Sequence, residues 1–161
     1  MSTRCFPLKF VILALAFTHA ASAQQICNNC CIKGNHIELD NSRRSVQAKW
    51  TSGQIPLCDK DLKGGWYRFK SFVGGKMPTK KVNVNHCGTQ APIWLKGNHP
   101  SLNDPVARVI ACVNIFERRR GCFFSFYVSV KHCPGNYYVY YLQPTHSCHI
   151  AYCAGKRKLK C

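Results

Sequence analysis

The residues in this sequence whose spacing first suggests chemistry are the cysteines of the run Cys27-Asn28-Asn29-Cys30. A C-x-x-C pair is typical of a redox dithiol when it accompanies a βαβ pattern. Here a third cysteine, Cys31, follows directly, and no βαβ pattern surrounds the run. We therefore predict that these cysteines form structural disulfide bridges.

Histidines beside cysteines, as in His86-Cys87 and Cys148-His149, could suggest a zinc site. However, their spacing lacks the regularity of metal ligands, and thiols in an oxidising compartment form disulfides before they bind zinc. The same holds for all six histidines after residue 23: His36, His86, His99, His132, His146 and His149. We therefore predict neither a bound metal ion nor any other cofactor.

Catalytic patterns are weak in this chain. The one close pair of carboxylates, Asp59 and Asp61, stands beside Lys60 and Lys63, so these acids are expected to be solvated ion partners rather than an acid–base couple. No G-x-S-x-G run marks a serine nucleophile. The sequence predicts no catalytic residue, and hence a protein that is not an enzyme.

The N-terminal segment has the three parts of a secretory signal peptide. Its first ten residues are basic without an acid, residues 11–17 are an unbroken apolar run, and Ala21-Ser22-Ala23 is a small-residue cleavage signal. We expect residues 1–23 to be removed between Ala23 and Gln24, and the protein to be secreted and extracellular. The apolar run is shorter than the ~20 residues of a spanning helix. Since no later stretch is more apolar, no transmembrane segment is predicted.

The charge of the chain is strongly one-sided, with 23 Lys and Arg against 6 Asp and Glu. Such an excess attracts polyanions over long distances, and for an exported protein these are acidic glycans or anionic surfaces rather than nucleic acid. The candidate polyanion-binding residues are Arg118, Arg119, Arg120, Lys156, Arg157, Lys158 and Lys160, with Lys80 and Lys81 in support. The alternative is that the charge serves only solubility.

Aromatic and β-branched runs separated by Gly, Pro and Asn indicate strands over residues 65–69, 123–130 and 137–142. Residues 82–85 and 92–95 form shorter runs, and residues 106–116 fit either a strand or a helical turn. The fold class predicted is mainly β: a small, disulfide-stapled, antiparallel β domain with little helix.

Several longer motifs, taken together, resemble the cysteine-rich module of the uromodulin family, which includes the zymogen-granule membrane glycoprotein and oncoprotein-induced transcript 3. The motifs are Cys58-Asp59, Gly65-Trp66-Tyr67-Arg68-Phe69, Gly74-Gly75-Lys76-Met77-Pro78, Cys87-Gly88-Thr89-Gln90-Ala91-Pro92-Ile93-Trp94-Leu95, Val130-Lys131-His132-Cys133-Pro134-Gly135 and Cys148-His149-Ile150-Ala151-Tyr152-Cys153. The resemblance divides the chain into a signal peptide (1–23), a cysteine-rich lead (24–30), the module (31–153) and a basic tail (154–161).

The resemblance implies a β-rich fold with eight to ten cysteines in defined pairs. The pairs implied here are Cys31–Cys133, Cys58–Cys148, Cys87–Cys153 and Cys112–Cys122. Which of Cys27, Cys30 and Cys31 opens the framework stays open. Two further family cysteines, which pair with each other, are replaced here by Lys81 and Gly121.

Two departures from the family bear on function. In uromodulin-like proteins an N-linked glycan after the Trp-Leu motif acts as bait for bacterial lectins, but here Lys96 replaces the acceptor asparagine. The growth-factor-like repeats and polymerising domain of the larger members have no counterpart in the sequence. The glycan-decoy mechanism therefore does not transfer.

The four implied pairs leave Cys27, Cys30 and Cys161 after cleavage. The short spacing between Cys27 and Cys30 disfavours a bond between them, so one of the three is expected to link two chains as a covalent homodimer. The run Gly155-Lys156-Arg157 also has the form of a processing site, and cleavage there would remove Cys161.

These features favour a secreted, non-enzymatic extracellular binding module for an anionic glycan or surface. The abundant Tyr and Phe are expected to fill the core of such a module rather than stack on sugars. Two alternatives are a disulfide-linked structural component of an extracellular or mineral-associated matrix, and a defence or venom polypeptide.

Overall fold

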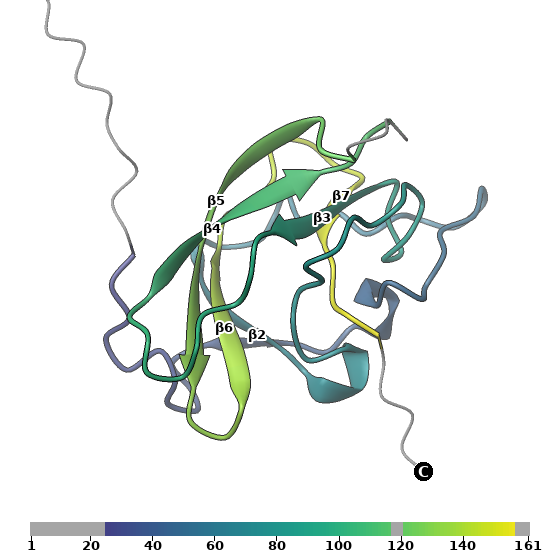
Figure 1. The fold of residues 1–161 in the computed structure, drawn as a ribbon. Helices are drawn as coiled ribbons and strands as arrows, with labels where there is room; N and C mark the ends of the chain where they lie inside the picture. Colours follow the sequence, from purple (N-terminus) through teal and green to yellow (C-terminus); the bar gives the residue numbers. More distant parts are fainter. Residues whose placement is uncertain (1–24, 117–120, 157–161) are drawn as a thin grey trace, which may run out of the picture.

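The computed structural model describes residues 25–116 and 121–156, which form one twisted sheet of seven strands with two short 3₁₀ helices (Figure 1). The strands are β1 (Ile37–Leu39), β2 (Gly65–Phe69), β3 (Ala91–Lys96), β4 (Ala107–Val113), β5 (Phe124–Cys133), β6 (Tyr137–Leu142) and β7 (Ile150–Tyr152). The 3₁₀ helices are η1 (Ser42–Arg44) and η2 (Ser71–Val73). The prediction of a mainly β, disulfide-stapled domain with little helix is confirmed.

The strand order is β1-β2-β6-β5-β4-β3-β7, so the long β5 lies at the centre of the sheet. The four inner pairs are antiparallel, as predicted, whereas β1 joins β2 and β7 joins β3 in parallel at the two edges. Both edge strands have three residues. Strands this short carry too little pattern to be predicted from their sequences, because their positions depend on a neighbour far along the chain.

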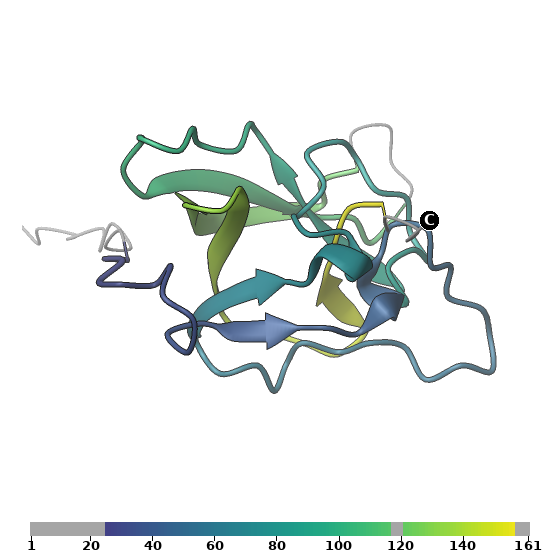
Figure 2. The same ribbon diagram turned by 90° about the horizontal axis from the view of Figure 1, so that it is seen from below.

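The sheet curls around its inner face, so that strands that are not neighbours come into contact (Figures 1 and 2). Side chains from β2 through β7 form one buried cluster that includes Phe69, Leu95, Val130 and Tyr140. The rings of Phe126 on β5 and Tyr152 on β7 lie 6.2 Å apart, although two strands separate them in the sheet. Residues 107–113 of the ambiguous run 106–116 form a strand, because each of them pairs with a residue of β5.

A smaller cluster lies on the outer face of β3, because successive side chains of a strand point to opposite sides. Ile93 belongs to the inner core, whereas Trp94 packs outward with Val82 and Cys112. Cys87 and Cys153 complete this outer cluster.

Five disulfides join described residues: Cys27–Cys30, Cys31–Cys133, Cys58–Cys148, Cys87–Cys153 and Cys112–Cys122. The last four are the pairs that the resemblance implies. The Cys58–Cys148 and Cys31–Cys133 bridges close loops of 90 and 102 residues, which limits the freedom of the unfolded chain.

The expectation that Cys27 and Cys30 do not bond to each other is wrong. Asn29 adopts a left-handed backbone conformation with a φ of 61°, and the resulting turn brings the two Cα atoms to 5.1 Å, an ordinary disulfide separation. Neither cysteine is therefore free to link two chains. The third predicted linking residue, Cys161, lies outside the described residues, as do the predicted signal peptide and cleavage position at Ala23 and Gln24.

The prediction of a solvated Asp59 is also wrong. The Asp59 side chain is 1% exposed and receives two hydrogen bonds from the guanidinium of Arg44, at 2.6 and 2.8 Å. The backbone N–H of Tyr152 donates a third at 2.8 Å. The partner of Asp59 is thus an arginine distant in sequence, not the neighbouring Lys60 or Lys63.

Candidate functional site

A strongly charged hollow lies between the segment that follows η2 and the described residues that follow β7. It has a volume of about 580 Å³. Its lining residues are Val46, Gly74, Lys76, Met77, Pro78, Thr79, Lys80, Lys81, Val82, Asn83, His86, Gly155 and Lys156. We call it the lysine hollow, because four exposed lysines line it.

Two backbone segments form the walls of the lysine hollow, and a glycine lets them approach closely. Gly155 donates a backbone hydrogen bond of 2.7 Å to the carbonyl of Lys76. At Gly74, whose φ is 131°, a Cβ atom would lie 2.3 Å from the Gly155 carbonyl oxygen. Only glycine fits there, so the Gly74-Gly75 turn of the sequence holds Lys76 beside Lys156.

Further contacts anchor the segment that carries the other two lysines. Pro78 accepts a backbone hydrogen bond of 2.9 Å from Leu95 on β3, and the buried Asn114 side chain donates one of 2.8 Å to the Val82 carbonyl. Lys80 and Lys81 lie between these two anchors. Their backbone positions are therefore fixed while their side chains remain exposed.

Two disulfides hold the surroundings of the lysine hollow. The Cys87–Cys153 bridge joins the residue after His86 to the strand end that precedes Gly155 and Lys156. The Cys112–Cys122 bridge holds Gly121, whose carbonyl accepts a hydrogen bond of 2.9 Å from the Trp94 indole. A Cβ at Gly121 would lie 2.5 Å from Cγ of Lys81, so Gly121 packs against that side chain.

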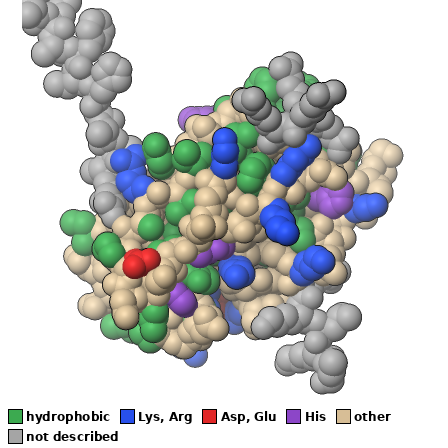
Figure 3. Space-filling view, in the orientation of Figure 1, with side chains coloured by type: hydrophobic (Ala, Val, Ile, Leu, Met, Phe, Trp, Pro, Cys, Tyr) green, Lys and Arg blue, Asp and Glu red, His purple; other side chains and the backbone are tan. Residues whose placement is uncertain are grey.

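The electrostatics of the lysine hollow favour an anion. Its lining includes Lys76, Lys80, Lys81 and Lys156 and no acidic residue. In Figure 3, Lys and Arg side chains are spread over much of the right half of the face shown, whereas the visible acidic atoms lie at the lower left. Ammonium groups on flexible stems suit sulfate, carboxylate or phosphate groups, which they meet as point charges.

Lys76 also reaches a cluster of aromatic rings outside the hollow. Its Nζ lies 6.0 Å from the ring centroid of Tyr138, which stacks on His132. Burial, with Lys76 and then His132 adding to it, lowers the pKa of His99 to about 4. Burial raises the pKa of Tyr140 well above its ordinary value, so its hydroxyl stays protonated beside His99 Nε2, 2.9 Å away.

A second hollow of about 590 Å³ lies over the inner face of the sheet and differs in character. Its lining residues are Ile93, Val113, Phe124, Phe126, Tyr127, Gln143, Pro144, Thr145, His146, Ile150 and Tyr152. We call it the aromatic hollow. It has no lysine, arginine or acidic residue in its lining, and therefore offers an anion no formal charge.

Three cysteines, Cys27, Cys30 and Cys31, also lie together at the N-terminal end of the described chain, with their sulfur atoms within 4.8 Å of one another. All three sulfurs are bonded in disulfides, so they do not provide thiolate ligands for a metal ion.

The part of the chain that the structure describes contains no helix with the length and apolarity needed to cross a bilayer.

The structure brings together three of the basic residues that the sequence selected: Lys80, Lys81 and Lys156. Arg118, Arg119, Arg120, Arg157, Lys158 and Lys160 lie outside the described residues. Sequence reasoning missed Lys76 and His86. Lys76 stands in the Gly74-to-Pro78 motif, but only the fold shows that this motif lies beside the end of the chain.

Comparison with known proteins agrees with this architecture. The sequence profile of the uromodulin-like domain matches residues 67–154. The chain is 42% identical over 136 residues to the pancreatic secretory granule membrane major glycoprotein GP2 of Rattus norvegicus, covering 83% of this chain and 24% of that protein. It is 38% identical over 132 residues to the Homo sapiens protein of the same name, covering 82% and 23%. The chain thus spans about a quarter of the length of these relatives.

Proposed function

We propose that this chain, which belongs to the uromodulin-like domain family, is a secreted, non-enzymatic extracellular module that binds an anionic glycan or surface through the lysine hollow. The observation that carries the proposal is a lining with four lysines and no acid: Lys76, Lys80, Lys81 and Lys156. Five disulfides among the described residues also support an oxidising, extracellular setting.

The volume and the apolar lining residues of the lysine hollow fit a glycan substituent better than a bare ion. Its volume of about 580 Å³ lies within the range of roughly 300–1,000 Å³ typical of small-molecule sites. The lining also contains four apolar residues: Val46, Met77, Pro78 and Val82. A sulfated or carboxylated sugar could place its ring on this lining and its anionic group among the ammonium groups.

The positions of the described chain ends extend the argument to a polymer. Gly121, which packs against Lys81, directly follows Arg118, Arg119 and Arg120 in the sequence. Lys156 directly precedes Arg157, Lys158 and Lys160. Both basic segments are therefore joined covalently to residues at the lysine hollow, as expected for a footprint longer than one sugar.

The decisive experiment compares two variants of equal net charge. In the hollow variant, Lys76, Lys80, Lys81 and Lys156 become alanine. In the control variant, four exposed lysines outside the hollow become alanine: Lys33, Lys60, Lys63 and Lys96. Binding to heparin is measured for both variants and for the unmodified chain over a range of salt concentrations.

We expect the hollow variant to lose most of its affinity and to show a flatter salt dependence, because fewer counterions are released on binding. The control variant should bind nearly as the unmodified chain does. Equal weakening of the two variants would mean that only the total charge matters, which would leave solubility as the role of the lysines.

A further inference from the structure

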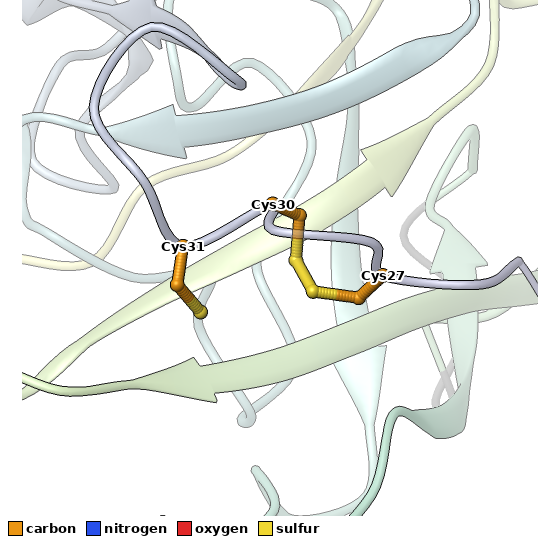
Figure 4. A group of neighbouring side chains, drawn as sticks. All are labelled: Cys27, Cys30 and Cys31. Atoms are coloured by element: carbon orange, nitrogen blue, oxygen red, sulfur yellow. A yellow bond between two sulfur atoms is a disulfide. The ribbon is translucent and has the colours of Figure 1, made fainter.

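The N-terminal cysteine cluster has an arrangement that a purely structural pair of bridges does not require. Figure 4 shows Cys27 and Cys30 joined by a disulfide, with Cys31 as the next residue along the chain. The sulfur atoms of all three residues lie within 4.8 Å of one another, and Cys31 is bonded to Cys133. Two disulfides therefore lie close enough for their sulfur atoms to exchange partners.

We propose that Cys27 is a site of modification by a small external thiol, and that this modification lets the chain exchange its two N-terminal disulfides for the alternative pairs Cys27–Cys31 and Cys30–Cys133. Burial sets the order of events. Cys27 is only partly buried, as is Cys31, whereas their partners are buried: Cys30 is 1% exposed and Cys133 is fully buried.

The first step is attack of an external thiolate on Sγ of Cys27, the less buried cysteine of its bridge. A bond forms between the external sulfur and Cys27, the Cys27–Cys30 bond breaks, and its electron pair leaves on Cys30 as a thiolate. The Cys30 thiolate then lies in the buried cluster that also contains Cys133 and Val139.

The second step is attack of Cys30 on Cys133, which releases Cys31 as a thiolate. The competing attack, on Cys31, would join consecutive residues whose Cα atoms are ~3.8 Å apart, less than the ~4.4 Å lower limit for ordinary disulfides. In the last step Cys31 attacks Cys27 and expels the external thiolate. Two disulfides exist before and after, so no oxidant or reductant is consumed.

Two hydrogen bonds to the backbone of the turn favour the observed pairs. The hydroxyl of Tyr137 donates to the carbonyl of Cys31, and the His36 ring lies 2.9 Å from the carbonyl of Cys30 through its Nδ1. Cζ of the Arg68 guanidinium lies 3.8 Å from the centroid of the Tyr137 ring, a cation–π contact that helps to hold this ring in place. In the alternative pairs Cys133 is bonded to Cys30 instead of Cys31, which shifts the point of attachment of the turn by one residue and would disturb these contacts.

The variant Cys27→Ser tests the exchange directly, because it keeps the Cys31–Cys133 bridge and leaves a single thiol in the cluster. The folded full-length chain is incubated above the usual thiol pKa of about 8.5 and alkylated. Digestion with trypsin and chymotrypsin, followed by fragmentation in the mass spectrometer, then locates the label. We expect label on both Cys30 and Cys31, with the share on Cys31 increased by the additional change Tyr137→Phe.

Label on Cys30 alone, with and without Tyr137→Phe, would overturn the proposed exchange. The control variant Cys27→Ser with Cys30→Ser should carry no label in the cluster. In the unmodified chain, reduced glutathione should add one molecule, at Cys27, in samples quenched with acid before the last step expels it. A folded chain that shows no glutathione after quenching at any time, and that keeps the Cys27–Cys30 and Cys31–Cys133 bridges, would overturn Cys27 as the modification site.

Discussion

The lysine hollow and the aromatic hollow are nearly equal in volume, about 580 and 590 Å³, yet their linings differ in almost every other respect. The lysine hollow lies beside the outer cluster, which contains Val82 and Trp94 on the outer face of β3. The aromatic hollow is lined by Ile93, which lies on the inner face of the same strand. Irregular segments supply most of the lining of the lysine hollow, and strands supply most of that of the aromatic hollow. The comparison teaches that charge, rather than space, distinguishes the candidate anion site.

The residues of the buried ion pair between Arg44 and Asp59 form hydrogen bonds with backbone at or next to both hollows. Both partners contact the backbone of Tyr152, which lines the aromatic hollow, and the carbonyl of Arg44 accepts a hydrogen bond of 2.7 Å from Ala154, next to the lysine hollow. Breaking this pair should therefore disturb both sites. Asp59→Ala should cost about 3–5 kcal/mol in the free energy of unfolding, because it leaves the Arg44 charge buried without its partner.

Urea denaturation measures this loss, and two control variants define its origin. Replacing both partners with apolar residues, as in Arg44→Met with Asp59→Leu, should recover part of the stability, because no charge stays buried but the Tyr152 N–H still loses its acceptor. Glu38→Ala removes the partly exposed pair with Lys70 and should change the free energy of unfolding little. A cost for Asp59→Ala as small as that for Glu38→Ala would contradict the assignment of a buried, structural pair.

Loss of a single disulfide, unlike loss of the ion pair, should affect one hollow and not the other. Cys58–Cys148 lies near Thr145 and His146 of the aromatic hollow, whereas Cys87–Cys153 joins the surroundings of the lysine hollow. Cys58→Ser and Cys87→Ser should each cost about 2–5 kcal/mol and reduce secretion. Among the folded, secreted fractions, only Cys87→Ser should show weakened heparin binding. Normal secretion of both variants would show that folding does not depend on these bridges.

A smaller change should distort the lysine hollow alone. Gly74→Ala places a Cβ against the Gly155 carbonyl in a left-handed conformation, and should cost about 1–3 kcal/mol and weaken heparin binding. Gly53→Ala is the matched control, because its φ of 96° is also positive but a Cβ there meets nothing within 4 Å. Thermal unfolding and heparin binding of the two variants isolate the effect of the close approach. Equal behaviour would show that the contact between Gly74 and Gly155 does not shape the site.

Much of the fold followed from local patterns in the sequence. The run 137–142 coincides with β6, and the aromatic and β-branched run from 123 predicts most of β5. The expectation that the aromatic residues fill the core holds for Tyr140 and Tyr152, whereas Phe116, Phe123 and Tyr127 are about half exposed. Alternation along a strand does not show which face the curled sheet will cover.

The candidate site was harder to predict, because it depends on contacts between distant residues. Lys80, Lys81 and Lys156 were selected for their charge, but nothing in the sequence places residue 76 against residue 155. Likewise, the partner of Asp59 is Arg44, whereas the neighbouring lysines were expected. Local composition identifies residues that could bind an anion, and the long-range backbone pairing decides which of them share a hollow.

The last prediction uses His99 to report on the lysine hollow. Because its pKa is about 4 in the folded chain and about 6.5 when unfolded, the unfolded state binds more protons between these values. The free energy of unfolding should therefore fall as the pH drops from about 6.5 to about 4, and should not depend on His99 above that window. His99→Gln should remove this part of the pH dependence.

The same titration distinguishes an anion bound in the lysine hollow from one bound elsewhere. Burial is the main cause of the low His99 pKa, but Lys76 is the next largest and lines the hollow. A sulfated oligosaccharide that neutralises Lys76 should therefore raise the pKa of His99, as should Lys76→Ala without a ligand. Nuclear magnetic resonance titration of the His99 ring protons measures both shifts. Adding the oligosaccharide to the Lys76→Ala variant should give little further change, because the charge it would neutralise is already gone. Binding that leaves the His99 pKa of the unmodified chain unchanged would place the anion outside the lysine hollow, and the comparison between the two hollows would then no longer explain recognition.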